Sequence, residues 1–228
     1  MVRRTKEEAQ ETHTRILDAA EQVFYDKDVA HASLEEITAA AEVTRGAIYW
    51  HFKDKAEIFD AMMQSVMMPA EEMVGCRSLD EDGPDPLEVL RRSAVEVLMR
   101  TARDKRTQRV MEIAYHKCEY VGDAKPVRDR HIASQKECLV TIEASFRACV
   151  KAGHLPKTLN PREAAIGAMS LVSGLIANWV LDPRSFSREK HAEPLVDAYF
   201  RGLAAAPAPR AASGSAASSP RSRRKAPG

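Results

Sequence analysis

The chain has 228 residues and a mass of 25.3 kDa, enough for one larger domain or two small ones with a real hydrophobic core. Its 44% hydrophobic and 29% charged residues are ordinary for a globular protein, and its formal net charge is +1. No apolar run is expected to reach the roughly 20 residues that cross a bilayer, and the charged N-terminus lacks the apolar stretch of a secretory signal. These features argue against membrane and secreted proteins and predict a cytoplasmic protein with no membrane partner.

The charge is distributed unevenly along the chain. Residues 1–60 carry 8 Lys and Arg against 13 Asp and Glu, a net charge of −5, whereas residues 206–228 carry five basic residues and no acidic one. A protein that coats nucleic acid over a wide surface would not have an acidic N-terminal part. A protein that presents one small basic and aromatic face can have one.

Helical patterns account for nearly the whole chain. Apolar residues recur every three or four positions, and there is no alternating strand pattern and no hairpin turn of the Asn-Gly type. Several helix starts combine a capping side chain with an acid three positions later, which satisfies backbone N–H groups in the first turn. These starts are Thr5-x-x-Glu8, Ser33-x-x-Glu36, Asp54-x-x-Glu57, Asp85-Pro-x-Glu88 and Asn160-Pro-x-Glu163.

The sequence therefore predicts an all-α protein of about nine helices. Three helices share the first 55 residues, a fourth runs from Lys55 towards Gly75, and residues 76–84 form a polar loop. Gly153 is expected to end the seventh helix, and the pair Asp182-Pro183 the eighth. The last five helices are expected near residues 86–103, 105–120, 126–152, 160–181 and 188–205.

Three parts of the chain follow from this organisation. Residues 1–55 are expected to form a small helical domain, and residues 56–205 a larger helical domain. Residues 206–228 are rich in Ala, Pro, Ser and Gly without an apolar period, so a disordered basic tail is expected there.

The segment TRGAIYWHFKDK, residues 44–55, is unlike the rest of the sequence. It holds a Tyr, a Trp, a His and a Phe in four consecutive positions, in a chain with only 13 Tyr, Trp and Phe. A tight turn around residues 42–44 separates it from the preceding short helix. Two short helices joined so closely and packed on a first helix make a helix-turn-helix unit.

One face of this third helix has the chemistry of a DNA reader. At roughly 100° per residue, Arg45, Gly46 and Tyr49 share a face, while Ala47 and Ile48 point towards the core. Arg can bond a guanine edge in a bidentate manner, Tyr can contact a thymine methyl group and a phosphate, and Gly lets DNA approach closely. The segment therefore predicts a surface that enters the major groove.

Residues beside this face have other expected roles. His51 and Lys55 lie just past it and are placed for phosphate contacts, as is Ser33 at a helix N-terminus. Trp50 and Phe52 are expected to pack against the first and fourth helices.

The run SLEEITAAAEVTRGAIYWHFKDKAEIF resembles the DNA-binding signature of TetR-type one-component repressors. The segments MVRRTKEEAQETHTRILDAAEQVF, MEIAYHKCEYVGD and LVSGLIANWVL resemble the AcrR and TtgR branch, local repressors of multidrug efflux operons. This resemblance covers residues 1 to about 205. It implies an all-α homodimer with a ligand pocket in the larger domain, which loses DNA binding when a drug-like molecule occupies that pocket.

Two residues depart from the family pattern. Asp28 and Glu42 stand where these relatives usually have glycine at helix ends, which suggests a left-handed backbone at position 42. Carried over by position, the DNA contacts would be made by Ser33, Thr44, Arg45, Gly46, Tyr49, His51 and Lys55.

The ligand site is expected in the larger domain. Methionine is flexible and polarizable, so a cavity lined by it accepts ligands of different shape, although plain core packing is the alternative for any single Met. Met63 and Met67 replace a more polar or aromatic lining in some relatives. The resemblance implies that residues at the pocket positions of this branch also bind the ligand. Together with the methionines, the predicted ligand-binding residues are Met63, Met67, Met111, Glu112, Tyr115, Cys138, Ile142, Val172, Ser173 and Ile176.

The helices expected at 160–181 and 188–205 form the predicted homodimer surface. The first is apolar nearly all round, as expected if one side faces the pocket and another faces a partner. A two-fold dimer sets its two recognition helices about 34–36 Å apart, or a multiple of that distance, and so requires a palindromic operator.

No cofactor, metal or catalytic residue is predicted. Glu112 and His116 are four apart with Cys118 nearby, but such spacing is common on solvated helix faces, and no P-loop, GxSxG or HExxH motif occurs. The predicted function is a ligand-responsive repressor whose partners are double-stranded operator DNA and a small hydrophobic or amphipathic inducer. Two alternatives stay open: a redox-switched repressor that uses Cys76 or Cys118, and an enzyme that uses the helical pocket.

Overall fold

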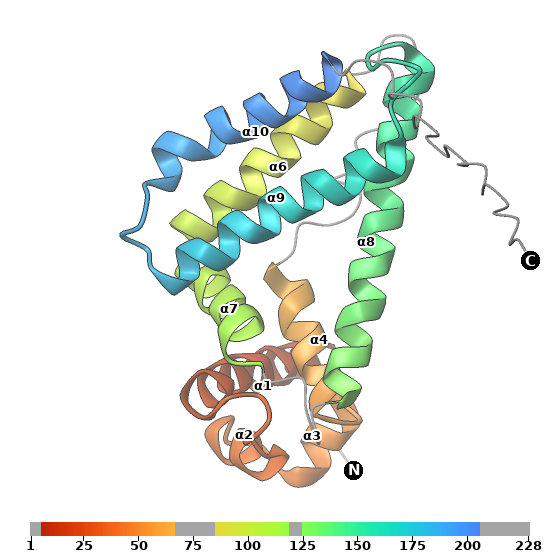
Figure 1. Ribbon diagram of the computed structural model, residues 1–228. Helices are drawn as coiled ribbons and strands as arrows, with labels where there is room; N and C mark the ends of the chain where they lie inside the picture. The colour runs from red at the N-terminus through yellow and green to blue at the C-terminus, as the bar shows by residue number, and fades with distance from the viewer. Residues whose placement is uncertain (1–5, 67–84, 119–124, 206–228) are drawn as a thin grey trace, which may run out of the picture.

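The computed structural model describes residues 6–66, 85–118 and 125–205, and within these ranges it contains nine α-helices and no β-strand (Figure 1). The predicted all-α class is confirmed. The described part of the fourth helix ends at Val66, and the expected loop at 76–84 and tail at 206–228 lie outside the described residues. The helices are α1 (Lys6–Lys27), α2 (Leu34–Ala40), α3 (Arg45–His51), α4 (Lys55–Val66), α6 (Pro86–Arg103), α7 (Lys105–His116), α8 (Lys125–Ala152), α9 (Pro161–Leu181) and α10 (Arg188–Ala204).

The helix starts follow the predicted capping pattern. Ser33 forms a full capping box, in which its Oγ accepts the N–H of Glu36 at 3.2 Å and the Glu36 carboxylate accepts the N–H of Ser33 at 3.1 Å. Asp54, Asp85 and Asn160 each accept a backbone N–H bond from the first turn of the helix that follows. Thr5, the expected cap of the first helix, lies outside the described residues.

Two ends of the molecule are built differently (Figure 1). Helices α1, α2 and α3 pack on one another at one end, and α4 leaves that end and runs towards the others. Helices α6, α9 and α10 lie at the opposite end, α7 contacts both α1 and α9, and the long α8 contacts α4, α6 and α9. The helices α4, α7 and α8 therefore connect the two ends.

Each end has a buried apolar interior. In the small end, Ile16 and Phe24 of α1, Ile37 of α2 and Ile48 of α3 are at most 1% exposed, which places the apolar faces of three helices against one another. Phe52, which follows α3, is also buried, as predicted. Burial of these side chains stabilises α2 and α3, which are too short to be stable alone.

Trp50 does not pack as predicted. Its side chain is 71% exposed, the largest exposed fraction among the large apolar residues of the described chain. Ile48 and Phe52 are four positions apart and share the inner face, whereas Trp50 is two positions from each and so points to the opposite side of α3. The expectation that Trp50 would be buried is wrong.

Helix α9 also differs from expectation. It is long and apolar enough to cross a membrane by length and composition, because Ala164 to Leu181 contains no charged residue. The expectation that no apolar run approaches this length is wrong. In the structure α9 packs against α6, α7, α8 and α10, so its apolar sides are used for contacts between helices.

Candidate DNA-binding face and ligand cavity

The turn between α2 and α3 is closed by a left-handed residue. Glu42 has φ of 51°, its N–H donates to Ala39, and the N–H of Val43 donates to Thr38, both at 3.2 Å. This is the Schellman arrangement, which usually has glycine at the left-handed position. Asp28, at the end of α1, has φ of 68°. The predicted left-handed backbone at position 42 is confirmed.

The outer face of α3 carries the predicted reading residues. Arg45, Gly46 and Tyr49 are exposed, whereas Ile48 is buried and Ala47 is half-buried, so the predicted division of the helix into two faces is confirmed. A Cβ atom added to Gly46 would meet no atom within 4 Å. The gap at Gly46 therefore opens to the outside of the molecule.

Thr44 begins α3 and has a structural bond of its own. Its Oγ1 accepts the N–H of Ala47 at 3.2 Å, which makes Thr44 the N-cap of the helix. The hydroxyl of Ser33 has the same role at the start of α2. Both residues are near the exposed end of the unit, and their predicted DNA contacts stay predictions.

The other two predicted DNA contacts are tied to the protein. The Lys55 ammonium donates to the carbonyl oxygens of Ala30 and Ala32 at 2.9 and 2.8 Å, which anchors the start of α4 to the loop between α1 and α2. The His51 ring is half-buried and lies against the ring of Trp50, with centroids 4.5 Å apart. These contacts give Lys55 and His51 positioning roles in the isolated chain, beside the phosphate contacts predicted for them.

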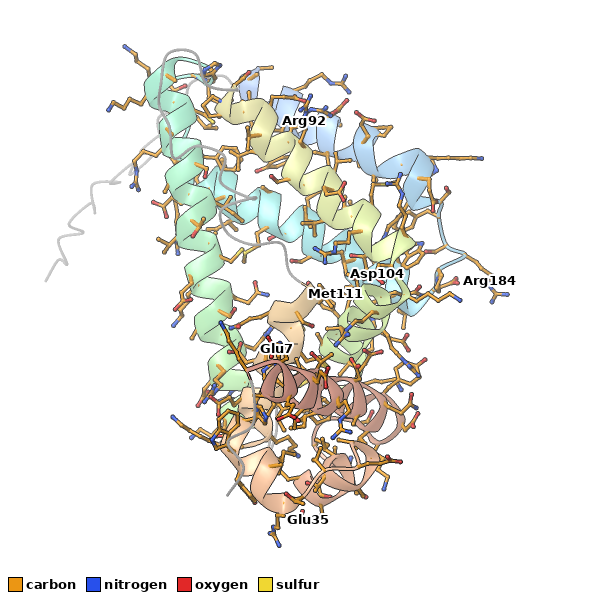
Figure 2. All side chains as sticks on the ribbon, turned by 180° about the vertical axis from the view of Figure 1, so that it is seen from behind. Glu7, Glu35, Arg92, Asp104, Met111 and Arg184 are labelled. Atoms are coloured by element: carbon orange, nitrogen blue, oxygen red, sulfur yellow. The ribbon has the colours of Figure 1, made fainter. Side chains whose placement is uncertain are left out.

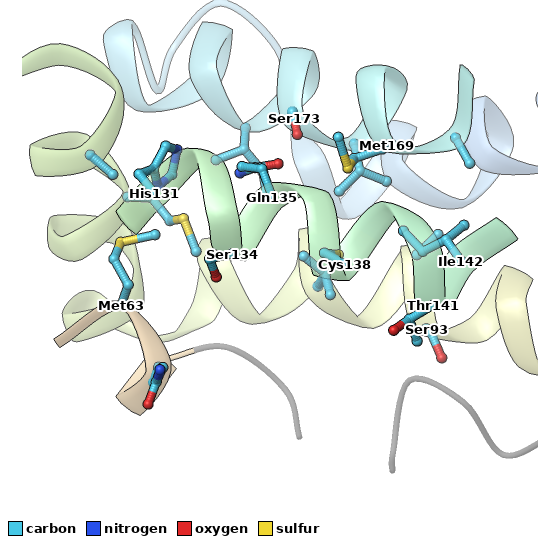
Figure 3. A pocket seen from close by; sticks show the side chains of 18 of the residues that line it. Met63, Ser93, His131, Ser134, Gln135, Cys138, Thr141, Ile142, Met169 and Ser173 are labelled. Atoms are coloured by element: carbon cyan, nitrogen blue, oxygen red, sulfur yellow. The ribbon is translucent and has the colours of Figure 1, made fainter. Parts of the chain in front are cut away.

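A cavity of about 160 Å³ lies between the helices of the larger part (Figure 3). A water molecule needs about 10–15 Å³ by the same measure, so the space could hold on the order of ten waters or one small organic molecule. Side chains of six helices line it: α4, α6, α7, α8, α9 and α10. Eight of the predicted ligand-binding residues are among them: Met63, Met111, Tyr115, Cys138, Ile142, Val172, Ser173 and Ile176.

Two predicted ligand-binding residues are not brought into the cavity. Glu112 lies on another side of α7, where its carboxylate acts on the phenol of Tyr25 in α1 and raises the pKa of that phenol. Met111 and Tyr115 are four positions apart and share the cavity face, whereas Glu112 is one position on and points elsewhere. Met67 lies outside the described residues.

The sequence-based prediction missed a polar stripe on α8. Ser134, Gln135 and Thr141 line the cavity at helical spacing with Cys138 (Figure 3). Ser145, one turn beyond Thr141, lines it as well. Weakly polar side chains along one face of a helix were the available signal, but the same pattern is typical of a solvent-exposed face. The result is a mostly apolar cavity with hydroxyl and amide groups on one wall.

Besides the ionic side chains of Asp60 and Arg130, two titratable groups line the cavity that burial keeps neutral. Burial lowers the pKa of His131, although the carboxylate of Asp60 partly opposes this, so the imidazole is neutral at pH 7. Burial also raises the pKa of the Cys138 thiol, which makes it a poor nucleophile at neutral pH. The cavity therefore suits an uncharged or amphipathic ligand better than a small ion.

Polar contacts join α7 to α1. Arg106 contacts Asp18 at 2.8 Å, and Glu21 lies 3.7 Å from Arg106 and 3.6 Å from Arg109. The charged groups of Arg109 and Lys117 lie 4.5 and 4.7 Å from the ring centroid of Tyr25. A helix that lines the cavity is thus bonded to the first helix of the small end.

His116, Cys118 and Cys76 were considered in the sequence as parts of a metal or redox site. Within the described ranges, no three His, Cys, Asp or Glu side chains converge as metal ligands, and His116 bonds the carbonyl of Ala177 at 2.9 Å. Cys118 is half-buried, and Cys76 lies outside the described residues.

The geometry of the two ends defines a class of protein. A compact three-helix unit with a tight turn exposes an arginine, a glycine and a tyrosine on its third helix, and three other helices connect it to a cavity-bearing part. This is the architecture of a transcription regulator that binds DNA through a helix-turn-helix unit.

The chain belongs to the TetR family of transcription regulators. Residues 16–62 match the family of bacterial regulatory proteins named after tetR, and residues 85–205 match the C-terminal region of MAATS-type transcriptional repressors. The predicted family is confirmed.

Individual relatives refine this assignment. The chain is 39% identical over 210 residues to the HTH-type transcriptional regulator TtgR of Pseudomonas putida, a match that covers 92% of this chain and 100% of TtgR. Among solved structures, NalD of Pseudomonas aeruginosa, the secondary repressor of the MexAB-OprM multidrug efflux pump, matches with a TM-score of 0.74 and 33% identity over 86% of this chain and 97% of NalD. SmeT, the repressor of the Stenotrophomonas maltophilia multidrug efflux pump SmeDEF, matches in its triclosan complex with a TM-score of 0.75 and 27% identity over 84% of this chain and 90% of SmeT. Homologues of the chain thus repress multidrug efflux operons.

Proposed function

We propose that this protein is a ligand-responsive repressor of a multidrug efflux operon, which binds a palindromic operator as a dimer and releases it when a small hydrophobic or amphipathic molecule fills the cavity. It would act in the cytoplasm, where the operator is. The proposed units are residues 1–55 for DNA binding and 56–205 for ligand binding and dimerisation, with a basic tail at 206–228.

The proposed DNA contacts use the exposed end of the small unit. Arg45 and Tyr49 would reach base edges and Gly46 would let the groove approach α3, while Ser33, Thr44, His51 and Lys55 would contact phosphates. Support comes from the exposure of the first three residues on one face of α3.

The proposal rests mainly on α4, because this one helix contacts the DNA-binding unit at its start and lines the cavity further along. Its first residue, Lys55, is hydrogen-bonded to the loop between α1 and α2. Later residues of the same helix line the cavity: Phe59, Asp60, Met63 and Gln64. Lys55 and Met63 are eight positions apart, about 12 Å along one helix. A ligand that displaces the middle of α4 would therefore move the DNA-binding unit. It would shift the equilibrium between the DNA-binding and the displaced arrangement only as far as its affinities for the two differ.

The proposed dimer surface is formed by α9 and α10. Three large apolar side chains on these helices stay exposed in the single chain: Ile166 is 44%, Leu181 is 69% and Leu195 is 39% exposed. Apolar residues on helices that already pack on the core are expected to be covered by a second copy, which gives the two-fold symmetry that a palindromic operator needs.

A triclosan titration tests the proposal. Triclosan is the probe because SmeT has been solved in complex with it. The duplex is the tightest binder that full-length protein selects from a random-sequence pool. We expect triclosan to release the wild-type protein from this duplex. Val172→Trp, which fills part of the cavity, should keep DNA binding and lose the release.

A matched control separates cavity filling from a general effect of tryptophan. Val140→Trp places the same ring at a position on α8 that is 60% exposed, and it should respond to triclosan like the wild type. If Val172→Trp is still released at wild-type triclosan concentrations, the cavity is not the inducer site.

A further inference from the structure

The guanidinium of Arg45 is held by a residue from the neighbouring helix. Its Nη2 donates to Oε1 of Glu35 at 2.9 Å, and its central carbon lies 6.0 Å from the ring centroid of Tyr49. Glu35 belongs to the first turn of α2, so this ion pair crosses the two helices of the helix-turn-helix unit. Glu35 lies at the outer extremity of the end of the molecule that α1, α2 and α3 form (Figure 2).

This ion pair contributes little to folding. The side chains of Arg45 and Glu35 are 70% and 61% exposed, and ion pairs exposed to this degree contribute little to stability because solvent screens them. Glu35 is also not needed as a cap, because Ser33 and Glu36 satisfy the start of α2. As an acid in the first turn, Glu35 favours α2 modestly through the helix dipole. On a face that meets a polyanion, however, the same carboxylate opposes binding, so a second role is worth testing.

We propose that Glu35 is a specificity-determining residue, which positions the Arg45 guanidinium for a guanine edge and disfavours its binding to phosphate. This inference rests on the proposed role of Arg45 as a base-reading residue. Glu35 would contact no base in this role, so it acts through Arg45.

The reason is the difference in charge between the two possible partners of Arg45. If Arg45 bonds a phosphate, that phosphate comes next to the Glu35 carboxylate, and the two negative charges repel. A guanine edge has no net charge, and it presents two acceptors to the donors that Glu35 leaves available. The same carboxylate thus opposes the phosphate contacts that dominate non-specific binding, while it restrains a long, flexible side chain in one orientation.

The environment of Arg45 agrees with this role. The side chain of Tyr49 and then the charge of Glu35 raise the pKa of Arg45, which shows that both neighbours favour the charged guanidinium held between α2 and α3. Glu35→Gln keeps the size of the side chain and removes its charge. We expect this variant to bind unrelated DNA about threefold to tenfold more tightly at low salt, and the preference for the selected duplex to fall by a similar factor.

The experiment uses full-length protein and two duplexes of equal length: the one selected from a random pool and an unrelated one. The quantity measured is the dissociation constant for the unrelated duplex divided by that for the selected duplex. Glu42→Gln is the control, because it removes one exposed negative charge between the same two helices and Glu42 has no ion pair with Arg45 among the described contacts. Arg45→Ala and the double variant Glu35→Gln/Arg45→Ala complete a double-mutant cycle.

The outcomes are distinguishable. The inference predicts that Glu35→Gln lowers the ratio, that Glu42→Gln leaves it unchanged, and that Glu35→Gln has no further effect once Arg45 is alanine. Equal shifts in both glutamine variants, or an effect of Glu35→Gln that persists without Arg45, would overturn it and leave the proposed function intact. If Arg45→Ala itself leaves the ratio unchanged, the base-reading role fails, and the inference fails with it.

Discussion

The backbone N–H of Val29 donates to the carbonyl oxygen of Lys117 at 3.1 Å. Val29 is fully buried in the loop between α1 and α2, and Lys117 is the C-terminal cap of α7. The bond joins the DNA-binding unit to a helix that lines the cavity, at a point separate from α4. A ligand that moves α7 would therefore displace the loop between α1 and α2, which also accepts the hydrogen bonds of the Lys55 ammonium.

Tyr25 tests this second connection. Its ring lies under the charged groups of both Arg109 and Lys117, and each such cation–π contact contributes about 0.5–1 kcal/mol at exposed sites. Tyr25→Leu should reduce the factor by which triclosan weakens DNA binding, by about threefold to tenfold. Tyr25→Phe keeps the ring beside both cations and loses only the phenol next to Glu112, so it should keep more of the factor than Tyr25→Leu does. Equal factors in the leucine and phenylalanine variants would show that the cation–π contacts of Tyr25 do not couple triclosan binding to DNA binding.

Gly46→Ala should separate stability from DNA binding. The added Cβ meets nothing within 4 Å, and alanine is favoured over glycine inside a helix by up to ~1 kcal/mol. We expect a free energy of unfolding at or above that of the wild type, together with weaker binding to the selected duplex. Urea unfolding and fluorescence anisotropy measure the two. Unchanged DNA affinity would show that the groove does not approach α3 at this position.

Glu42→Gly should stabilise the protein. A left-handed backbone costs about 1 kcal/mol in a residue other than glycine, and the φ of 51° at Glu42 makes that cost applicable here. Glu42→Gln keeps the strained backbone and serves as the control, so a thermal melt should rank the glycine variant above it. Both variants should bind DNA more tightly at low salt, because both lose a negative charge. A glycine variant that melts below the glutamine variant contradicts this account.

Arg188→Met should be at least as stable as the wild type. Arg188 is 1% exposed. Its Nη1 donates to the carbonyl of Leu98 at 2.8 Å, and its guanidinium carbon lies 4.1 Å from the Trp179 ring centroid. Its Nε and Nη2 have no hydrogen-bond partner among the described residues. Burial lowers the pKa of Arg188 to about 10, so the guanidinium is still charged at pH 7 although its removal from water is unfavourable. Replacement of poorly satisfied buried charges by apolar residues can gain ~1 kcal/mol or more.

Chemical denaturation at pH 7 measures the effect at Arg188. Arg184→Met, at a side chain that is 96% exposed, is the control and should not change stability. Arg188→Ala should be less stable than Arg188→Met, because it leaves a cavity. A methionine variant that loses as much stability as the alanine variant would show that the guanidinium itself stabilises the fold.

His131 should make the protein sensitive to acid. Burial holds the pKa of the folded state below the ordinary value of 6.5. As the pH falls through 6.5, the unfolded chain therefore takes up a proton before the folded protein does, and stability is lost. His131→Gln should lose less stability between pH 7 and pH 5 than the wild type, by up to ~1.4 kcal/mol per pH unit. Urea unfolding at several pH values measures this, and parallel curves would rule it out.

Most of the fold could be predicted from the sequence because the helix ends are marked chemically. Ser33 with Glu36, Asp85 before Pro86 and Gly153 with its φ of 84° all lie where their local chemistry requires. Side-chain environment was harder to predict. Trp50 was expected to pack because aromatic clusters at helix ends usually do, although its spacing from Ile48 puts it on the outer side of α3.

The cavity was predicted only in part, for a similar reason. Tyr115 was predicted from the resemblance to the AcrR and TtgR branch, and Met111 from the chemistry of methionine, and both line the cavity. Ser134 and Thr141 were missed, because a hydroxyl side chain on a helix looks the same in the sequence whether it faces solvent or an enclosed space. The position of Glu112 depends on Tyr25, which lies 87 positions earlier in the chain, and no local pattern records that contact.

The central claim is that ligand and operator favour different arrangements of the same protein, and calorimetry tests it most directly. Triclosan is titrated into full-length protein alone and into protein saturated with the selected duplex. Because linkage is reciprocal, the duplex should weaken triclosan binding by the same factor by which triclosan weakens duplex binding, a factor of about 5 to 150 for typical coupling energies. Equal triclosan affinity with and without the duplex would contradict the account.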